Sequence, residues 1–292
     1  MHTLMLHGHA TSAFIFKAQT QQFRSKLDKS YTFDFVDAPI PSELPLSLKR
    51  VFKTAYTWLS SSSDDRTNVS SIRQTASWLL SYMEKNGPYD CVCCFSLSAA
   101  IILTLILDNR FSEKPRQKLP FKSVIFMNAS IEYSVFEAHG LQITDEARDF
   151  KKRAERILYD KANDLSNLAN IMTLKSRGTA DMWKDTSVLL HDAKVLPERE
   201  DCFGLDVTAF PADLLSGEGD DDDDLPTMHI YGDKDPIYSS GIQVAYLCGK
   251  GKDGTDMLNH QGGHDVPRNP KIALEVAGLF RKMNRRLEEG GM

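Results

Sequence analysis

A serine stands where a predicted strand gives way to a predicted helix. Residues 90–95 form a short apolar run typical of a buried strand, and residues 97–107 form a nearly unbroken apolar run typical of a buried helix. A sharp turn between them would lift the Ser96 hydroxyl off the sheet and direct the Leu97 backbone N–H at a developing oxyanion. Such a turn needs small residues two positions before and after the serine, where Cys94 and Ser98 stand. This pattern indicates a nucleophile.

Two later segments contain the partners that a serine nucleophile needs. Residues 227–231 predict a strand followed by Asp233 and Asp235, and residues 256–258 predict a strand followed by a glycine-rich loop that ends at His264. An imidazole must take the proton of the serine hydroxyl, and a carboxylate must fix the tautomer of the imidazole. The chain order of serine, acid and histidine is that of the α/β-hydrolases.

Both partners have a competitor close by in the sequence. Asp233 is a second candidate for the acid, and His260 is a second candidate for the base. We favour His264 because the two glycines at 262–263 give the loop the freedom to bring an imidazole over the edge of the sheet.

The first predicted strand leads to a second oxyanion donor. Residues 3–6 predict a strand that opens into a loop at Gly8. The backbone N–H of His9 or Ala10 is expected to act beside that of Leu97, and His7 is expected to shape the loop.

Taken in order, these fragments make the chain similar to the FSH-type serine hydrolases, a branch of the α/β-hydrolases that is common in fungi and often found in polyketide gene clusters. The resemblance implies a triad of Ser96, His264 and Asp235, because the second carboxylate of the acidic turn stands at the family spacing. The matching residues are Leu6-His7-Gly8 with Ser12, Ile15 and Phe16, then Asp37-Ala38-Pro39, Ser96, Gly232-Asp233-Lys234-Asp235, and Gly262-Gly263-His264 with Pro267.

The chain departs from the family pattern beside the expected nucleophile. The family usually has Gly-Phe-Ser-Gln-Gly at residues 94–98, and it has a glycine-containing turn where this chain has Met-Asn-Ala-Ser at 127–130. Two function classes therefore stay open. One is a serine hydrolase that cleaves an ester or thioester and releases a polyketide or fatty acyl chain, which a carrier could hold. The other is a non-hydrolytic acyltransferase or cyclase on the same fold, or a binding protein with a vestigial triad.

The alternation of helical patterns with short β-rich runs predicts an α/β-hydrolase fold, with a doubly wound and mostly parallel sheet in a single domain over residues 1–292. The alternation stops between residues 131 and 225, where a helical cap is expected, with a plain crossover that carries extra surface helices as the alternative. The apolar residues of the cap are predicted to line the acyl pocket, and Leu97 beside the serine favours a bulky apolar acyl group. The predicted lining residues are Ile131, Val135, Phe136 and Trp183.

Composition narrows the function classes. The 292 residues carry a formal net charge of −5, and the five consecutive aspartates at 220–224 account for all of it. The electrically balanced remainder argues against nucleic-acid binding, and the aspartate run is expected to be a solvated loop. No signal peptide or membrane span is expected, so the protein is predicted to be cytoplasmic. It is expected to be a monomer or a homodimer.

The five cysteines predict reduced thiols. Cys91, Cys93 and Cys94 fall in one predicted strand, with the first two expected on one face and Cys94 on the other. The Cys94 thiol could be proposed as a nucleophile, but a thiol buried in a sheet is inert. No second ligand pair at zinc spacing accompanies them, so no metal and no cofactor is expected.

Overall fold

The computed structural model describes residues 1–49, 51–60, 68–111, 118–140, 142–164, 183, 185–191, 225–248 and 255–290. A six-stranded sheet in the order β2-β1-β5-β6-β7-β8 runs through the molecule, and every neighbouring pair in it is parallel. Its strands are β1 (His2–Leu6), β2 (Thr32–Val36), β5 (Cys91–Phe95), β6 (Val124–Met127), β7 (Thr227–Tyr231) and β8 (Thr255–Asn259).

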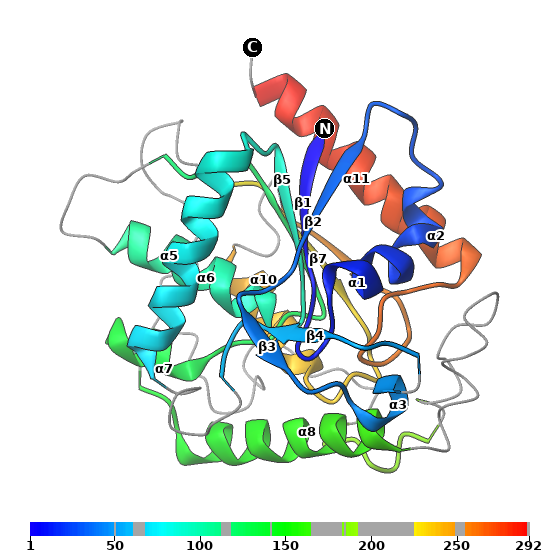
Figure 1. Cartoon of the computed structure of the whole chain (residues 1–292). Coiled ribbons are helices and arrows are strands. Elements are labelled where there is room, and N and C mark those ends of the chain that lie inside the picture. Colours follow the sequence, from blue (N-terminus) through cyan, green and yellow to red (C-terminus); the bar gives the residue numbers. More distant parts are fainter. Residues whose placement is uncertain are drawn as a thin grey trace.

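Helices cover both faces of this sheet, as Figure 1 shows. One face packs against α5 (Val69–Asn86), α6 (Ser98–Arg110) and α10 (Tyr238–Leu247). The other packs against α1 (Ala13–Gln19), α2 (Gln21–Arg24) and α11 (Pro270–Gly290). This is the α/β-hydrolase architecture that the sequence predicts.

The central strand and the helix after it explain why the sequence pattern is so apolar there. All five residues of β5 are buried, and ten consecutive residues of α6, from Ser98 to Leu107, are buried as well. A parallel strand between two helical layers has no solvent side, so it reads as a continuous apolar run. As predicted, Cys94 packs into the core on one face, while Cys91 and Cys93 pack into the core on the other.

Residues 39–45 contain three prolines and still include a strand. Their three prolines suggest a loop, yet β3 (Ile40–Ser42) pairs antiparallel with β4 (Ala55–Thr57) in a separate two-stranded ribbon. Pro41 lies opposite Tyr56 in this pairing. A two-stranded ribbon consists only of edge strands, where a missing backbone N–H costs no ladder bond on the outer side. The short helix α3 (Leu46–Lys49) follows.

Helices stand where the sequence predicts a cap. The described part of residues 131–225 contains α7 (Tyr133–Ala138) and α8 (Asp145–Asn163), and α8 crosses the molecule below the edge at which the strands of the sheet end (Figure 1). Lys151 of α8 donates from Nζ to the Ile131 carbonyl (2.6 Å) and to the Glu132 carboxylate (2.7 Å). Phe150 and Ala154 of α8 pack against Ile237 in the turn after β7. The aspartate run at 220–224 lies outside the described residues.

The described residues contain buried thiols but neither a membrane-spanning helix nor a metal-binding cluster. Cys91, Cys93, Cys94 and Cys248 are buried and form no disulfide with one another, and Cys202 lies outside the described ranges. Where the structure describes the chain, it has no helix that is both long and apolar enough to cross a membrane. The same residues contain no group of three or more histidine, cysteine or acidic side chains arranged to hold a metal ion.

Candidate active site

Ser96 occupies the corner between β5 and α6 in a strained backbone conformation. Its φ is 57°, in the left-handed region that side chains other than glycine rarely adopt. The Ser96 N–H donates to the Met127 carbonyl (3.0 Å), and the Phe95 N–H donates to the Ser98 hydroxyl (2.9 Å). Ser98 Oγ also lies 3.1 Å from the Leu6 carbonyl of the neighbouring strand. The small residue at 98 therefore braces the turn that exposes the serine.

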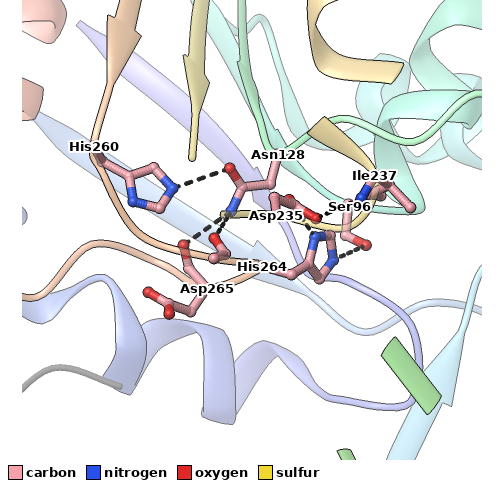
Figure 2. Close-up of polar contacts among 8 residues, drawn as sticks. Ser96, Asn128, Asp235, Ile237, His260, His264 and Asp265 are labelled. Atoms are coloured by element: carbon pink, nitrogen blue, oxygen red, sulfur yellow. Dashed lines mark hydrogen bonds and ion pairs between the residues drawn. The ribbon is translucent and has the colours of Figure 1, made fainter. Parts of the chain in front are cut away.

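An unbroken line of hydrogen bonds joins the three residues that the resemblance implies (Figure 2). His264 Nε2 lies 2.8 Å from Ser96 Oγ, and His264 Nδ1 lies 2.7 Å from Asp235 Oδ2. Because the carboxylate only accepts, Nδ1 carries a proton, which leaves Nε2 of the neutral ring to accept from the serine hydroxyl. The other oxygen of Asp235 accepts from the Ile237 N–H (2.9 Å), and the residue is fully buried. This constellation can abstract a proton from the serine.

The two competitors face elsewhere. The Asp233 carboxylate accepts from the Asn259 side-chain amide through Oδ2 (3.2 Å). His260 Nε2 lies 3.1 Å from Asn128 Oδ1. Burial lowers the pKa of His260 to about 4, so its ring is neutral at physiological pH. Neither side chain belongs to the line of hydrogen bonds that reaches Ser96.

The loop after β1 lies directly against the serine. A Cβ at Gly8 would stand 2.8 Å from the Phe95 ring and 3.2 Å from Ser96 Cβ, so only glycine allows this approach. Ala10 in the same loop has a φ of 51°. Leu97 is the N-cap of α6, which puts its N–H at the positive end of the helix. Gly8, in the loop predicted to carry one oxyanion donor, thus lies beside Ser96, and Leu97, predicted to carry the other, follows Ser96 in the chain.

His7 holds the loop in shape through a fixed tautomer. The Ala38 N–H donates to His7 Nε2 (3.0 Å), so the ring proton is on Nδ1, which donates to the Gly8 carbonyl (2.7 Å). Burial lowers the pKa of His7, which keeps this arrangement neutral. Trp58 Nε1 donates to the His7 carbonyl (2.6 Å). His7 and Ala38, which match the family pattern but take no part in the proposed chemistry, therefore have a structural role in holding this loop.

The side chains predicted to line a pocket fall into two groups. Ile131, Val135 and Phe136 are buried in the core that also contains α5 and α6. Trp183 instead packs its indole on the histidine loop, since a Cβ at Gly263 would lie 2.0 Å from it. The segment that carries the first three begins beside the nucleophile, because the Ser130 N–H donates to the Ser96 carbonyl (3.2 Å).

Two contributors have no signal in the sequence pattern. Trp58 lies in no recognisable motif, and only the fold brings its indole to the His7 carbonyl. Asn128 is noticeable as a departure from the usual turn after β6, but nothing in the sequence connects it to a loop more than 130 residues away. Both act through contacts between distant segments.

The sequence profile of the serine hydrolase (FSH1) family matches residues 1–193 and 211–276. The chain belongs to this family. Among the relatives of this serine hydrolase, the dihydromonacolin L-[lovastatin nonaketide synthase] thioesterase of Aspergillus terreus is 34% identical, over 96% of this chain and 91% of its own. Esterase alnB of Emericella nidulans is 26% identical, over 91% of this chain and 90% of its own. The solved structure of Zea mays acyl-protein thioesterase 2 aligns over 97% of this chain and 93% of its own, with 14% identity and a TM-score of 0.48.

Proposed function

We propose that this serine hydrolase cleaves a carboxylic ester or thioester through a covalent acyl-enzyme on Ser96. The observation that carries the proposal is the continuous hydrogen bonding from Ser96 through His264 to buried Asp235, with both distances below 3 Å. A serine hydroxyl is a weak nucleophile by itself, and an adjacent oriented imidazole is what activates it. The intact arrangement disfavours a vestigial triad.

In the first half of the reaction, Ser96 Oγ bonds to the acyl carbon as its proton moves to His264 Nε2. The carbonyl π electrons move onto oxygen, where the N–H groups of Leu97 and of His9 or Ala10 stabilise the charge. The tetrahedral species then expels the alcohol or thiol, which takes the proton from His264. Acyl-Ser96 remains. Water repeats the sequence, with His264 as base and Ser96 as leaving group, and releases the carboxylic acid.

The helical segment after β6 is assigned the role of a cap over this site. Three of its described side chains contact the turns that hold the acid and the base. Phe150 packs on Ile237 beside Asp235, Trp183 packs on Gly263 beside His264, and His191 Nε2 lies 2.7 Å from the Asp233 carbonyl. A segment so attached can limit the access of bulk solvent to the site and shape the space that the acyl chain occupies.

A bulky apolar acyl group is the proposed substrate. Leu97 beside the nucleophile and the segment that starts at Ile131 are apolar and pack into the core, and the acyl chain is proposed to lie against this part of the protein. Each methylene that an acyl chain buries there contributes roughly 0.8 kcal/mol, so longer chains are favoured until the space is full. The thioesterase relative, named for dihydromonacolin L and lovastatin nonaketide synthase, supports a polyketide acyl chain on a carrier as the natural donor.

The test is a chain-length series of p-nitrophenyl esters and acyl thioesters, with products identified in the presence and absence of a competing alcohol. We expect free acid as the product and increasing kcat/KM up to a medium or long chain. Faster turnover of acetyl and butyryl donors than of all longer ones would refute the proposal that the site binds a bulky apolar acyl group. Labelling of Ser96 by a fluorophosphonate with no acid formed from any donor would replace hydrolysis by acyl transfer or cyclisation.

A further inference from the structure

The loop that carries His264 crosses a long distance before it reaches the serine. It leaves β8, which is three positions from β5 in the sheet, so with strands about 4.8 Å apart the loop spans roughly 14 Å. His264 stands five residues beyond Asn259, the last residue of β8. A loop of this reach needs fixed points along its path if the imidazole is to stay within hydrogen-bond distance of Ser96.

Asn128 provides such a point from the end of β6, which lies directly beside β5. Its side chain is 2% exposed, and its Nδ2 lies 3.3 Å from the Gly263 carbonyl and 3.0 Å from the Asp265 carbonyl. These two residues flank His264 in the chain. Figure 2 shows the amide directed at the loop on both sides of the imidazole. Both hydrogens of one amide therefore hold the backbone on either side of the base.

The orientation of this amide follows from its surroundings. Two backbone carbonyls face one end, and since carbonyls only accept, that end must be the NH₂ group. The other end is then Oδ1, which accepts from His260 Nε2 at 3.1 Å. His260 in turn donates its backbone N–H to the Tyr231 carbonyl of β7 (2.8 Å). His260, the first residue of the loop, thus orients the Asn128 amide, and the amide in turn holds the middle of the same loop at Gly263 and Asp265.

The backbone of Asn128 adopts a strained conformation at the position from which its amide makes these contacts. Its φ is 44°, in the left-handed region that asparagine tolerates better than most side chains. The Asn128 N–H donates to the Ile230 carbonyl of β7 (2.7 Å), which anchors the residue to the sheet. A strained residue with every polar group of its side chain engaged indicates a role in positioning rather than a chance turn.

We infer that Asn128, with its amide oriented by His260, is a positioning residue for His264 in the reaction. This inference rests on the proposed function, because it assigns to the pair the placement of the base that activates Ser96. Neither side chain touches the reacting atoms. Their effect is expected on the chemical step, since a displacement of about 1 Å in a catalytic group can lower a rate about 100-fold.

Two substitutions at Asn128 separate the amide from the backbone. Asn128→Gly removes the side chain, while glycine accepts the left-handed conformation without strain, so the fold is expected to persist. Asn128→Asp keeps the shape but turns a carboxylate oxygen toward two carbonyls. We expect kcat per active site to fall about 10- to 100-fold in Asn128→Gly and further in Asn128→Asp, with KM within about threefold of the unsubstituted enzyme.

A second pair of variants tests whether His260 works only through its donor. The Gln side chain in His260→Gln can place an N–H near the position of Nε2, whereas His260→Leu offers no donor. We expect His260→Gln to retain kcat within about threefold and His260→Leu to resemble Asn128→Gly. The double variant His260→Leu/Asn128→Gly should be no slower than the slower single variant, because both remove the same constraint. Full inactivation of His260→Gln would instead indicate a direct role for that imidazole.

Asn259→Ala serves as the matched control. It removes another asparagine amide at the start of the same loop, but its hydrogen bonds go to Asp233 and to the Gln261 N–H. We expect loss of thermal stability with kcat per active site nearly unchanged. Active sites are counted in every variant by titration with a fluorophosphonate, so a smaller folded fraction is not mistaken for a slower step.

The outcomes distinguish this inference from the proposed function. Ser96→Ala is measured in parallel on the same p-nitrophenyl ester. If Ser96→Ala is inactive and Asn128→Gly retains kcat within twofold, the positioning role is wrong and the acyl-enzyme mechanism stands. If Ser96→Ala still turns over the ester, the proposed function is wrong. A raised KM with unchanged kcat in Asn128→Gly would also overturn the positioning role.

Discussion

The carboxyl ends of β5 and β8 place their catalytic candidates in opposite ways. After β5, Ser96 follows the strand at once, and the brace for its turn comes from Ser98, two residues later. After β8, His264 stands five residues out, and its loop is held by Asn128 from another strand. The position of the nucleophile is thus specified locally, whereas that of the base depends on long-range contacts. Substitutions at the two strand ends should therefore have different effects on kcat and on the free energy of unfolding.

Ser96→Ala is expected to have the largest effect. It removes the nucleophile, so turnover should fall by several orders of magnitude, as is general for a triad member. Hydrolysis of a p-nitrophenyl ester and labelling by a fluorophosphonate measure the loss. Retained labelling would show that another residue reacts and would remove the basis for comparing the two strand ends.

Asp235→Asn should come next, with kcat about 10³- to 10⁴-fold lower, because the amide no longer fixes the His264 tautomer. The matched control is Asp233→Asn in the same turn, whose carboxylate binds Asn259 instead. Only a few-fold change is expected there. Equal losses in the two variants would mean that the whole turn, and not one carboxylate, supports the base.

Acid should destabilise the fold through its buried histidines. Burial lowers the pKa of His260 to about 4 and that of His229 to about 3, against about 6.5 for an unfolded histidine. The unfolded chain therefore binds protons first as the pH falls below 6.5, and the free energy of unfolding decreases from there toward pH 4. At pH 5 the loss is roughly 2 kcal/mol for each histidine.

Urea unfolding at pH 7.5 and pH 5 measures this loss. His260→Gln cannot titrate, so it should lose less stability between the two pH values than the unsubstituted chain. An identical pH dependence in the variant would show that His260 does not contribute. A smaller loss in His260→Gln would locate part of the acid sensitivity in the loop after β8.

Ser98→Ala should show the reverse profile of Asn128→Gly. It leaves the Phe95 N–H without its side-chain acceptor in a buried place, at a cost of about 1–3 kcal/mol in the free energy of unfolding. The methyl group still fits the turn, so kcat should stay within a few-fold. A large loss of kcat with unchanged stability would indicate that the elbow, too, depends on fine positioning.

The same contrast explains how much could be predicted from the sequence. The parallel sheet, the elbow at Ser96 and the order of the segments follow from apolar runs and small residues that are local in the chain. The predicted strands at 90–95 and 227–231 are confirmed as Cys91–Phe95 and Thr227–Tyr231. The short strand through Pro41 was not predictable, because its partner at Tyr56 is what forms it.

The sequence predicts the three residues that the structure brings within hydrogen-bond distance of one another, but not the residues that support them. The choice of His264 over His260 could be argued from the two glycines before it, while the engagement of His260 with Asn128 depends on the crossing of a loop over two strands. Trp58 and Trp183 contact the two loops beside Ser96 only because distant segments fold back onto them. Local patterns contain no information on such contacts.

The cysteines of β5 can report how often the sheet opens at its central strand. Cys91, Cys93 and Cys94 are inaccessible to solvent, and burial raises the pKa of Cys91 to about 12 and those of the other two as well. A thiol reagent at neutral pH can react with them only after the central strand has left its neighbours. In a Cys202→Ser/Cys248→Ser background, only the thiols of β5 remain, so their modification rate would measure how often the strand leading to Ser96 separates from its neighbours, without any probe added to the chain.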